Sequence, residues 1–235
     1  MTNPSRLLRE HALAFRSLHV PGRPLILPNA WDVASARLVE DAGAGAVATT
    51  SAGVAWALGA ADGERLDRER APAVVAGIAG AVRVPVTADV ESGWADDPAG
   101  VARTVRAVLD AGAVGVNIED ALHGPGPAPL RPVAEHLAAG ADGIFVPGAV
   151  DPETVREPAG GIDAPLNVMA GPGAPPAGEL AALGVARVSV GAGIAQAAHA
   201  LVRRAARELL GTGTYGAQDA GLDYGTLNTL MGEGR

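Results

Sequence analysis

The sequence predicts an α/β fold in which parallel strands alternate with helices around a TIM-type (β/α)8-like barrel. Seven short apolar runs alternate with longer amphipathic stretches, which is the pattern of a parallel sheet covered by helices. Glycine repeatedly follows the helical stretches, at the positions where a helix would end before the next strand. Polar residues gather at the carboxyl ends of successive runs. Such residues converge on one site if the sheet closes, which favours a barrel over an open doubly wound sheet.

The predicted elements follow one another in a single domain that spans residues 1–235. An amphipathic helix at residues 3–20 comes first, and a helical tail at residues 212–235 comes last. The uncharged run at residues 42–61 is interpreted as a buried strand that continues into a loop. The predicted strands are residues 25–28, 46–50, 85–90, 115–119, 143–147, 166–170 and 187–191. The predicted helices between and after them are residues 31–41, 66–82, 97–111, 130–139, 151–156, 176–183 and 194–210.

Composition excludes several mechanisms. The 235 residues contain no cysteine, so a disulfide, a thiolate zinc site and a cysteine nucleophile are excluded. All 18 basic residues are arginine, which also excludes a Schiff-base lysine. The net charge of -8 disfavours nucleic acid and anionic membranes as partners, and the sequence predicts neither a signal peptide nor a membrane segment. We therefore expect a cytoplasmic protein that acts on a small molecule.

Acidic residues follow two neighbouring predicted strands. Asp89 and Glu91 lie two positions apart, so on an extended chain both carboxylates would point to the same side. Glu119 and Asp120 end the next strand. Acids focused at one edge of a sheet repel one another unless a cation or protons intervene, and oxygen ligands without cysteine select a hard ion. The pattern predicts a Mg²⁺ site, with Mn²⁺ as the alternative ion.

These acids have a second interpretation, in which they cap the following helices or pair with arginines. Asp97 and Asp151 each precede proline and are predicted to be N-caps of this kind. For Asp120 the two interpretations carry equal weight. His123 lies in a segment rich in Gly and Pro over the expected site, and is a candidate acid or base, with a surface histidine as the alternative.

The polar residues belong to longer motifs. In chain order these are Leu27-Pro-Asn-Ala-Trp-Asp, Thr49-Thr-Ser-Ala-Gly-Val-Ala-Trp, Ala88-Asp-Val-Glu-Ser-Gly, Asn117-Ile-Glu-Asp, Ala141-Asp-Gly-Ile-Phe-Val-Pro-Gly and Pro165-Leu-Asn-Val-Met-Ala. Together they resemble the isocitrate lyase and phosphoenolpyruvate mutase superfamily over nearly the whole chain. The resemblance is specifically to the short bacterial members of that superfamily.

The resemblance implies a Mg²⁺-dependent enzyme that forms or cleaves a carbon-carbon or phosphorus-carbon bond. Its substrate would be a small 2-oxo or 2-hydroxy carboxylate, and the reaction would pass through a metal-stabilised enolate. By resemblance, Asp89 would bind the metal directly. Asp62, Glu91 and Glu119 would hold metal-bound waters.

The resemblance also implies how the substrate is held. The turn formed by Thr50, Ser51, Ala52 and Gly53 would donate backbone N-H groups to a substrate carboxylate, and Asn167 is predicted to contribute to the same site. Superfamily members exchange a C-terminal helix between subunits in dimers or tetramers. We therefore expect a homo-oligomer, with a tail helix docked on its own barrel as the alternative.

The chain departs from the superfamily pattern in two places. Superfamily lyases that act on isocitrate or methylisocitrate carry a catalytic cysteine, so those two activities are not expected here. Between residues 120 and 142 the chain is too short for the fifth strand, its substrate-binding arginine and its helix, so the predicted barrel lacks one β/α unit. A catalytically impaired paralogue that binds metal and a small carboxylate without turnover is the alternative function. An open-sheet nucleotide-binding module is a third, which the absence of a glycine fingerprint disfavours.

Overall fold

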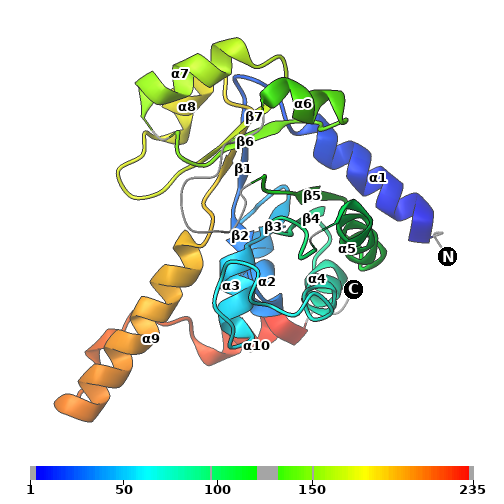
Figure 1. Cartoon of the computed structure of the whole chain (residues 1–235). Coiled ribbons are helices and arrows are strands. Elements are labelled where there is room, and N and C mark those ends of the chain that lie inside the picture. The colour runs from blue at the N-terminus through cyan, green and yellow to red at the C-terminus, as the bar shows by residue number, and fades with distance from the viewer. Residues whose placement is uncertain (1–3, 96, 121–131, 150, 233–235) are drawn as a thin grey trace.

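The computed structural model describes residues 4–95, 97–120, 132–149 and 151–232, and strands alternate with helices along them (Figure 1). The strands are β1 (Leu25–Leu27), β2 (Asn29–Ala30), β3 (Val47–Thr49), β4 (Val86–Asp89), β5 (Gly115–Asn117), β6 (Ile144–Val146), β7 (Leu166–Met169) and β8 (Arg187–Ser189). Their ladders are all parallel. Each predicted strand is present, with β1 and β2 together in the place of the first, and the predicted α/β class is confirmed.

The strands form two four-stranded sheets, with the orders β6-β7-β8-β1 and β2-β3-β4-β5. β1 and β2 are consecutive in the chain and are separated by Pro28, whose nitrogen carries no hydrogen for a ladder bond. Leu27 pairs with Ser189 in the first sheet, and Asn29 pairs with Ala48 in the second. The interrupted strand therefore links the two sheets.

The predicted shortfall of one strand corresponds to the place where the two sheets end. β5 and β6 are the terminal strands, and no ladder joins them within the described ranges. Both are half-buried at every position, whereas β3 and β8 are fully buried. The described part of the chain thus supplies seven strand positions, as predicted. The candidate acid or base His123 lies in residues 121–131, outside the described residues.

Helices pack around the strands (Figure 1). Asp97 accepts a hydrogen bond from the N-H of Gly100 at 2.9 Å, and Asp151 accepts one from the N-H of Thr154 at 3.0 Å, so both are N-caps as predicted. No helix in the described ranges has the length and apolar character needed to cross a membrane. The helices are α1 (Pro4–Ser17), α2 (Val33–Asp41), α3 (Ser51–Ala57), α4 (Ala71–Ala81), α5 (Pro98–Asp110), α6 (Val133–Ala138), α7 (Pro152–Gly161), α8 (Ala177–Ala182), α9 (Gly193–Gly211) and α10 (Tyr224–Gly232), with a 3-10 turn η1 (Gly216–Gln218).

Helix α3 corrects the interpretation of residues 42–61, which expected a loop after the strand. The helix packs closely at Gly53, where an added Cβ would lie 2.7 Å from Cγ2 of Thr50 and 2.9 Å from Cβ of Trp31. Glycine is a poor helix former, so residue propensities argue against this helix. Close tertiary packing stabilises it instead, and a sequence pattern does not reveal that packing.

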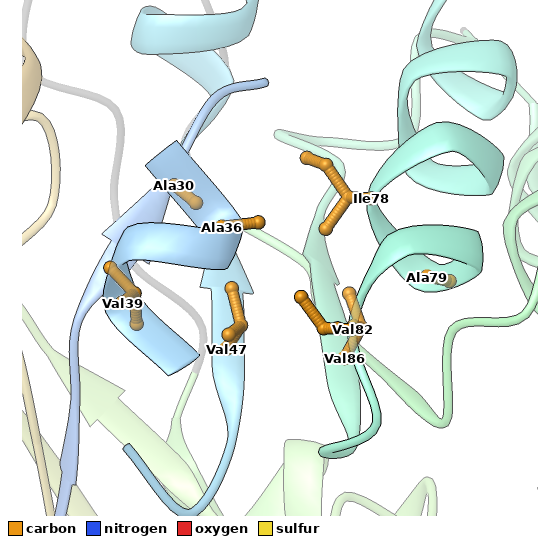
Figure 2. Packing of buried hydrophobic residues seen from close by; sticks show 8 residues of the cluster. All are labelled: Ala30, Ala36, Val39, Val47, Ile78, Ala79, Val82 and Val86. Atoms are coloured by element: carbon orange, nitrogen blue, oxygen red, sulfur yellow. The ribbon is translucent and has the colours of Figure 1, made fainter. Parts of the chain in front are cut away.

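Two apolar layers lie between the sheets and the surrounding helices. Figure 2 shows the first, in which Val47 of β3 and Val86 of β4 lie between Val39 of α2 and Ile78 of α4. The second lies between β7, β8 and the helices α7 and α8. Its buried members are Ala149, Val155, Leu166, Val168, Leu180, Val185 and Val188.

The opposite face of the strands carries polar side chains. Because side chains alternate along a strand, Asp89 points inward beside Ala88, which packs in an outer apolar cluster. Arg187 points inward in the same way beside Val188. At the amino ends of the strands, Phe15 of α1 packs against apolar residues of β1 and β3. The interior therefore carries polar groups from both sheets, with Asp89 at the carboxyl end of β4 and Arg187 at the amino end of β8.

Candidate functional site

Asp89 is the last residue of β4, and three hydrogen bonds fix it in place. Its backbone N-H donates to Oγ1 of Thr49 at 2.9 Å. Its Oδ2 accepts from the backbone N-H of Ser51 at 3.1 Å, and its Oδ1 accepts from the N-H of Glu91 at 3.3 Å. Each carboxylate oxygen keeps lone-pair capacity beyond these bonds. The carboxylate is therefore oriented and can still coordinate a ligand.

Glu91 does not continue the strand, which corrects the extended geometry assumed for it. Its φ is +49°, in the left-handed region, so the chain turns just after β4. The side chain is 3% exposed. Its Oε1 accepts from Nε1 of Trp94 at 3.1 Å, and its Oε2 accepts from the backbone N-H of Glu64. Ser92 in turn donates to the carboxylate of Glu64, so the loop that carries Asp62 is tied to the loop after β4.

The site concentrates negative charge. Burial raises the pKa of Asp89, and the N-H donors of Ser51 and Glu91 oppose that rise. Burial also raises the pKa of Glu91, against the bond from Trp94. The charge of Asp62 raises the pKa of both carboxyls further, so these three acids interact electrostatically.

The donor set fits a hard cation. The groups that act on Asp89 include the carboxylates of Asp62 and Glu91 and the side chain of Ser51, and a divalent cation there would offset the repulsion between the carboxylates, which adds to the effect of burial on both pKa values. Among the described residues, no three His, Asp or Glu side chains are grouped so that they could hold an ion by themselves. Mg²⁺ commonly binds one or two carboxylates and keeps several waters, so Asp89 with water-mediated neighbours is a chemically reasonable set.

Glu119 and Asp120 follow β5, which pairs with β4. The backbone N-H of Glu119 donates to the carbonyl of Glu91 at 2.7 Å, and its side chain is exposed. Asp120 instead lies 3.1 Å from Nε2 of His136 on α6. The structure therefore brings Glu119 next to the loop after β4, while Asp120 contacts a histidine, where its predicted alternative to metal binding was a helix cap or a pair with an arginine.

The predicted substrate-binding residues divide into two groups. Thr50, Ser51, Ala52 and Gly53 form the start of α3, directly beside Asp89. Asn167 lies on β7 in the other sheet, buried, with its Nδ2 donating to Oγ of Ser189 at 3.1 Å. The turn at residues 50–53 therefore lies beside the Asp89 carboxylate, whereas Asn167 is hydrogen-bonded to Ser189 within its own sheet.

Arg187 was not singled out from the sequence. It starts β8, is 6% exposed, and its Nη2 donates to Oδ1 of Asn117 at 3.3 Å. Burial lowers the pKa of Arg187 to about 10, and the negative charge of Asp89 opposes that effect. The sequence did offer a signal for this residue, which is a charged side chain at the beginning of a strand predicted to be buried. Such a side chain must point either into the interior or out to solvent.

Parallel strands with surrounding helices and acidic side chains at a carboxyl end are the features of the TIM-barrel type of enzyme. The family model for phosphoenolpyruvate phosphomutase matches residues 15–139 and 133–210. The chain therefore belongs to the phosphoenolpyruvate phosphomutase family.

Two similar proteins support this assignment, and a third shares the fold. A Mycobacterium tuberculosis protein of uncharacterized activity is 35% identical over 230 residues, which cover 80% of this chain and 87% of the relative. A Burkholderia cenocepacia structure assigned as a lyase or mutase is also 35% identical, with a TM-score of 0.85 over 97% of this chain and 98% of the other. Oxaloacetate acetylhydrolase with its product oxalate has a TM-score of 0.80 at 20% identity over 94% of each chain, which shows a shared fold.

Proposed function

We propose that this protein is a Mg²⁺-dependent lyase or mutase. It would form or cleave a carbon-carbon or phosphorus-carbon bond of a small 2-oxo or 2-hydroxy carboxylate through an enolate. The observation that carries the proposal is the Asp89 carboxylate, which is held at the end of β4 by two N-H donors and surrounded by the charges of Asp62 and Glu91.

Each acid has a separate part in the proposal. Asp89 would bind the ion directly, because its carboxylate is the one that points inward at the end of a strand. Glu91, with both oxygens already accepting hydrogen bonds, would act through water, as would the exposed Asp62 and Glu119. A bound Mg²⁺ would polarise the substrate oxygen on which negative charge develops.

The start of α3 would hold the substrate carboxylate. The Ser51 N-H is bonded to Asp89, so the following backbone groups at Ala52 and Gly53 lie next to the carboxylate. Ala52 and Gly53 are buried, which excludes water that would compete for these groups. Their position supports a substrate bound between this turn and the ion.

The substrate is proposed to be a dicarboxylate of the size of oxaloacetate. Oxaloacetate acetylhydrolase, which shares the fold, was solved with its product oxalate, a small dicarboxylate. The absence of cysteine from this chain argues against cleavage of isocitrate or methylisocitrate.

Turnover tests the proposal. Oxaloacetate, dimethylmalate-like acids and phosphonopyruvate would be incubated with the parent and with Asp89→Asn in Mg²⁺, and the products followed by NMR. The proposal expects conversion of at least one compound by the parent and its loss in the variant. The second candidate, a binder without turnover, is favoured by the seven strand positions of the described residues, and it predicts ligand binding with no conversion of any compound.

We also propose that the protein is a homo-oligomer. Helix α9 extends away from the sheets in Figure 1, and Val202 and Leu210 on it are 67% and 86% exposed. Large exposed apolar side chains on a projecting helix favour contact with a second copy of the chain. Light scattering would measure a dimer or tetramer for the parent and a smaller species for Val202→Glu. A parent that is monomeric at all concentrations would contradict this proposal.

A further inference from the structure

The interior of the fold contains a buried cation that the proposed metal site does not use. Arg187 enters from β8, opposite the sheet that carries Asp89, and is 6% exposed. A guanidinium offers five N-H donors in a planar fork and stays charged at neutral pH. A buried charge of this kind is costly unless hydrogen bonds and an opposite charge compensate it.

The described contacts compensate only part of this cost. The guanidinium donates to Oδ1 of Asn117 at 3.3 Å, which is a long bond to a neutral group. Its Nε is buried and has no hydrogen-bond partner within the described residues. No ion pair of Arg187 with a carboxylate occurs in the same part of the chain. Several donors of the fork thus remain for an anion.

The arginine lies close to the proposed metal site. Asn117, its hydrogen-bond partner, is the Cα partner of Asp89 in the ladder between β4 and β5. The guanidinium therefore reaches the strand next to the carboxylate, and the charge of Asp89 acts on it. Arg187 also acts on the titratable group of His19, whose pKa is lowered by burial and to a smaller extent by Arg187. The nearest polar side chains of β7 and β8, Asn167 and Ser189, are bonded to each other.

We propose that Arg187 binds one carboxylate of a small dianionic ligand whose other end lies at Asp89. This inference rests on the proposed function and adds a specificity-determining residue to it. The planar fork can donate to both oxygens of a carboxylate. A monocarboxylate bound at the α3 turn has no second carboxylate for Arg187 to bind. Arg187 would thereby select dicarboxylates over monocarboxylates.

Three variants test the assignment. Arg187→Met removes the charge and keeps a long side chain, and folding is expected because the buried guanidinium has no ion-pair partner among the described residues and is costly to bury. Arg187→Lys keeps the charge and removes the fork. Arg37→Met is the matched control, because Arg37 is a partly buried arginine on α2 that donates to the carbonyl of Leu230 at 2.6 Å, outside the interior.

Each protein would be titrated by calorimetry and thermal unfolding with Mg²⁺ alone, with oxalate in Mg²⁺, and with oxalate in EDTA. Loss of a charged bidentate bond should weaken oxalate binding about 100-fold in Arg187→Met and about 10-fold in Arg187→Lys. The response to Mg²⁺ alone should be that of the parent in both, and Arg37→Met should bind oxalate as the parent does.

Three results would overturn the assignment: an unchanged oxalate affinity in Arg187→Met, a loss of its response to Mg²⁺ alone, or a parent that binds no oxalate. The second would mean that Arg187 supports the metal site and does not touch the ligand. A parent that binds oxalate through Arg187 in EDTA but responds to no Mg²⁺ and converts no substrate would support the assignment and contradict the proposed function.

Discussion

The backbone N-H of Ser51 donates to Oδ2 of Asp89 at 3.1 Å, across 38 positions of the sequence. This bond joins the first residue of α3 to the last residue of β4. It places the turn expected to hold the substrate directly against the carboxylate expected to hold the metal. The close packing at Gly53 fixes α3 and therefore fixes this bond.

Replacing Asp89 with Asn tests the metal site. The change keeps the size of the side chain and removes its charge, so the fold should persist and the affinity for Mg²⁺ should fall by about 100-fold or more. Thermal unfolding with and without Mg²⁺ measures this as loss of the metal-dependent rise in Tm. Asp151→Asn is the control, because it changes an N-cap of α7 to another good capping residue. If the Tm of Asp89→Asn rises with Mg²⁺ as much as that of the parent, Asp89 does not bind the ion.

The raised carboxyl pKa values predict a pH dependence of the metal-free protein. Asp89 and Glu91 titrate above the ordinary values of 3.8 and 4.5, so between the ordinary and the raised values the folded state holds protons that the unfolded chain releases. The free energy of unfolding contributed by these groups therefore falls as pH rises through that window. Urea unfolding in EDTA from about pH 4 to pH 8 should show this fall in the parent.

The variant Asp89→Asn isolates that contribution. Exposed carboxyls elsewhere, such as Glu208 and Asp223, have lowered pKa values and change stability with the opposite sign, so the difference between parent and variant is the relevant quantity. The variant should gain stability relative to the parent as pH rises. Saturating Mg²⁺ should reduce this difference in the free energy of unfolding between variant and parent, since the ion stabilises only the parent's ionised carboxylate. A constant difference at all pH values would contradict the raised pKa of Asp89.

Packing at the start of α3 predicts a strong effect of one added methyl group. Gly53→Ala would place a Cβ 2.9 Å from that of Trp31, so the free energy of unfolding should fall by about 1 to 3 kcal/mol. Gly80→Ala is the matched control, because Gly80 lies in α4 with nothing within 4 Å of the added Cβ. That change should stabilise the protein by about 0.5 to 1 kcal/mol. Equal effects of the two substitutions in urea unfolding would contradict the packing account.

The strands were predictable because their signal is local. Runs such as residues 25–28 and 143–147 are apolar and are preceded by a turn that contains glycine or proline, and both contain strands in the structure. The shortfall of one strand position was also predictable, because the chain between residues 120 and 142 is too short to hold another β/α unit. The position of Asp89 at a strand end followed from the same pattern.

Three features were not predictable because they depend on contacts distant in sequence. Helix α3 is stabilised by packing at Gly53 against Trp31. The left-handed turn at Glu91 accompanies bonds to Trp94 and to the backbone of Glu64, the latter 27 positions away. The contact of Arg187 with Asn117 joins residues 70 positions apart.

Calorimetric titration of the parent with Mg²⁺, followed by oxalate, is the decisive test of a metal and carboxylate site at Asp89. We expect saturable Mg²⁺ binding and tighter oxalate binding when the ion is present, since the two ligands would meet at Asp89. A protein that binds no Mg²⁺, alone or with oxalate, has no such site.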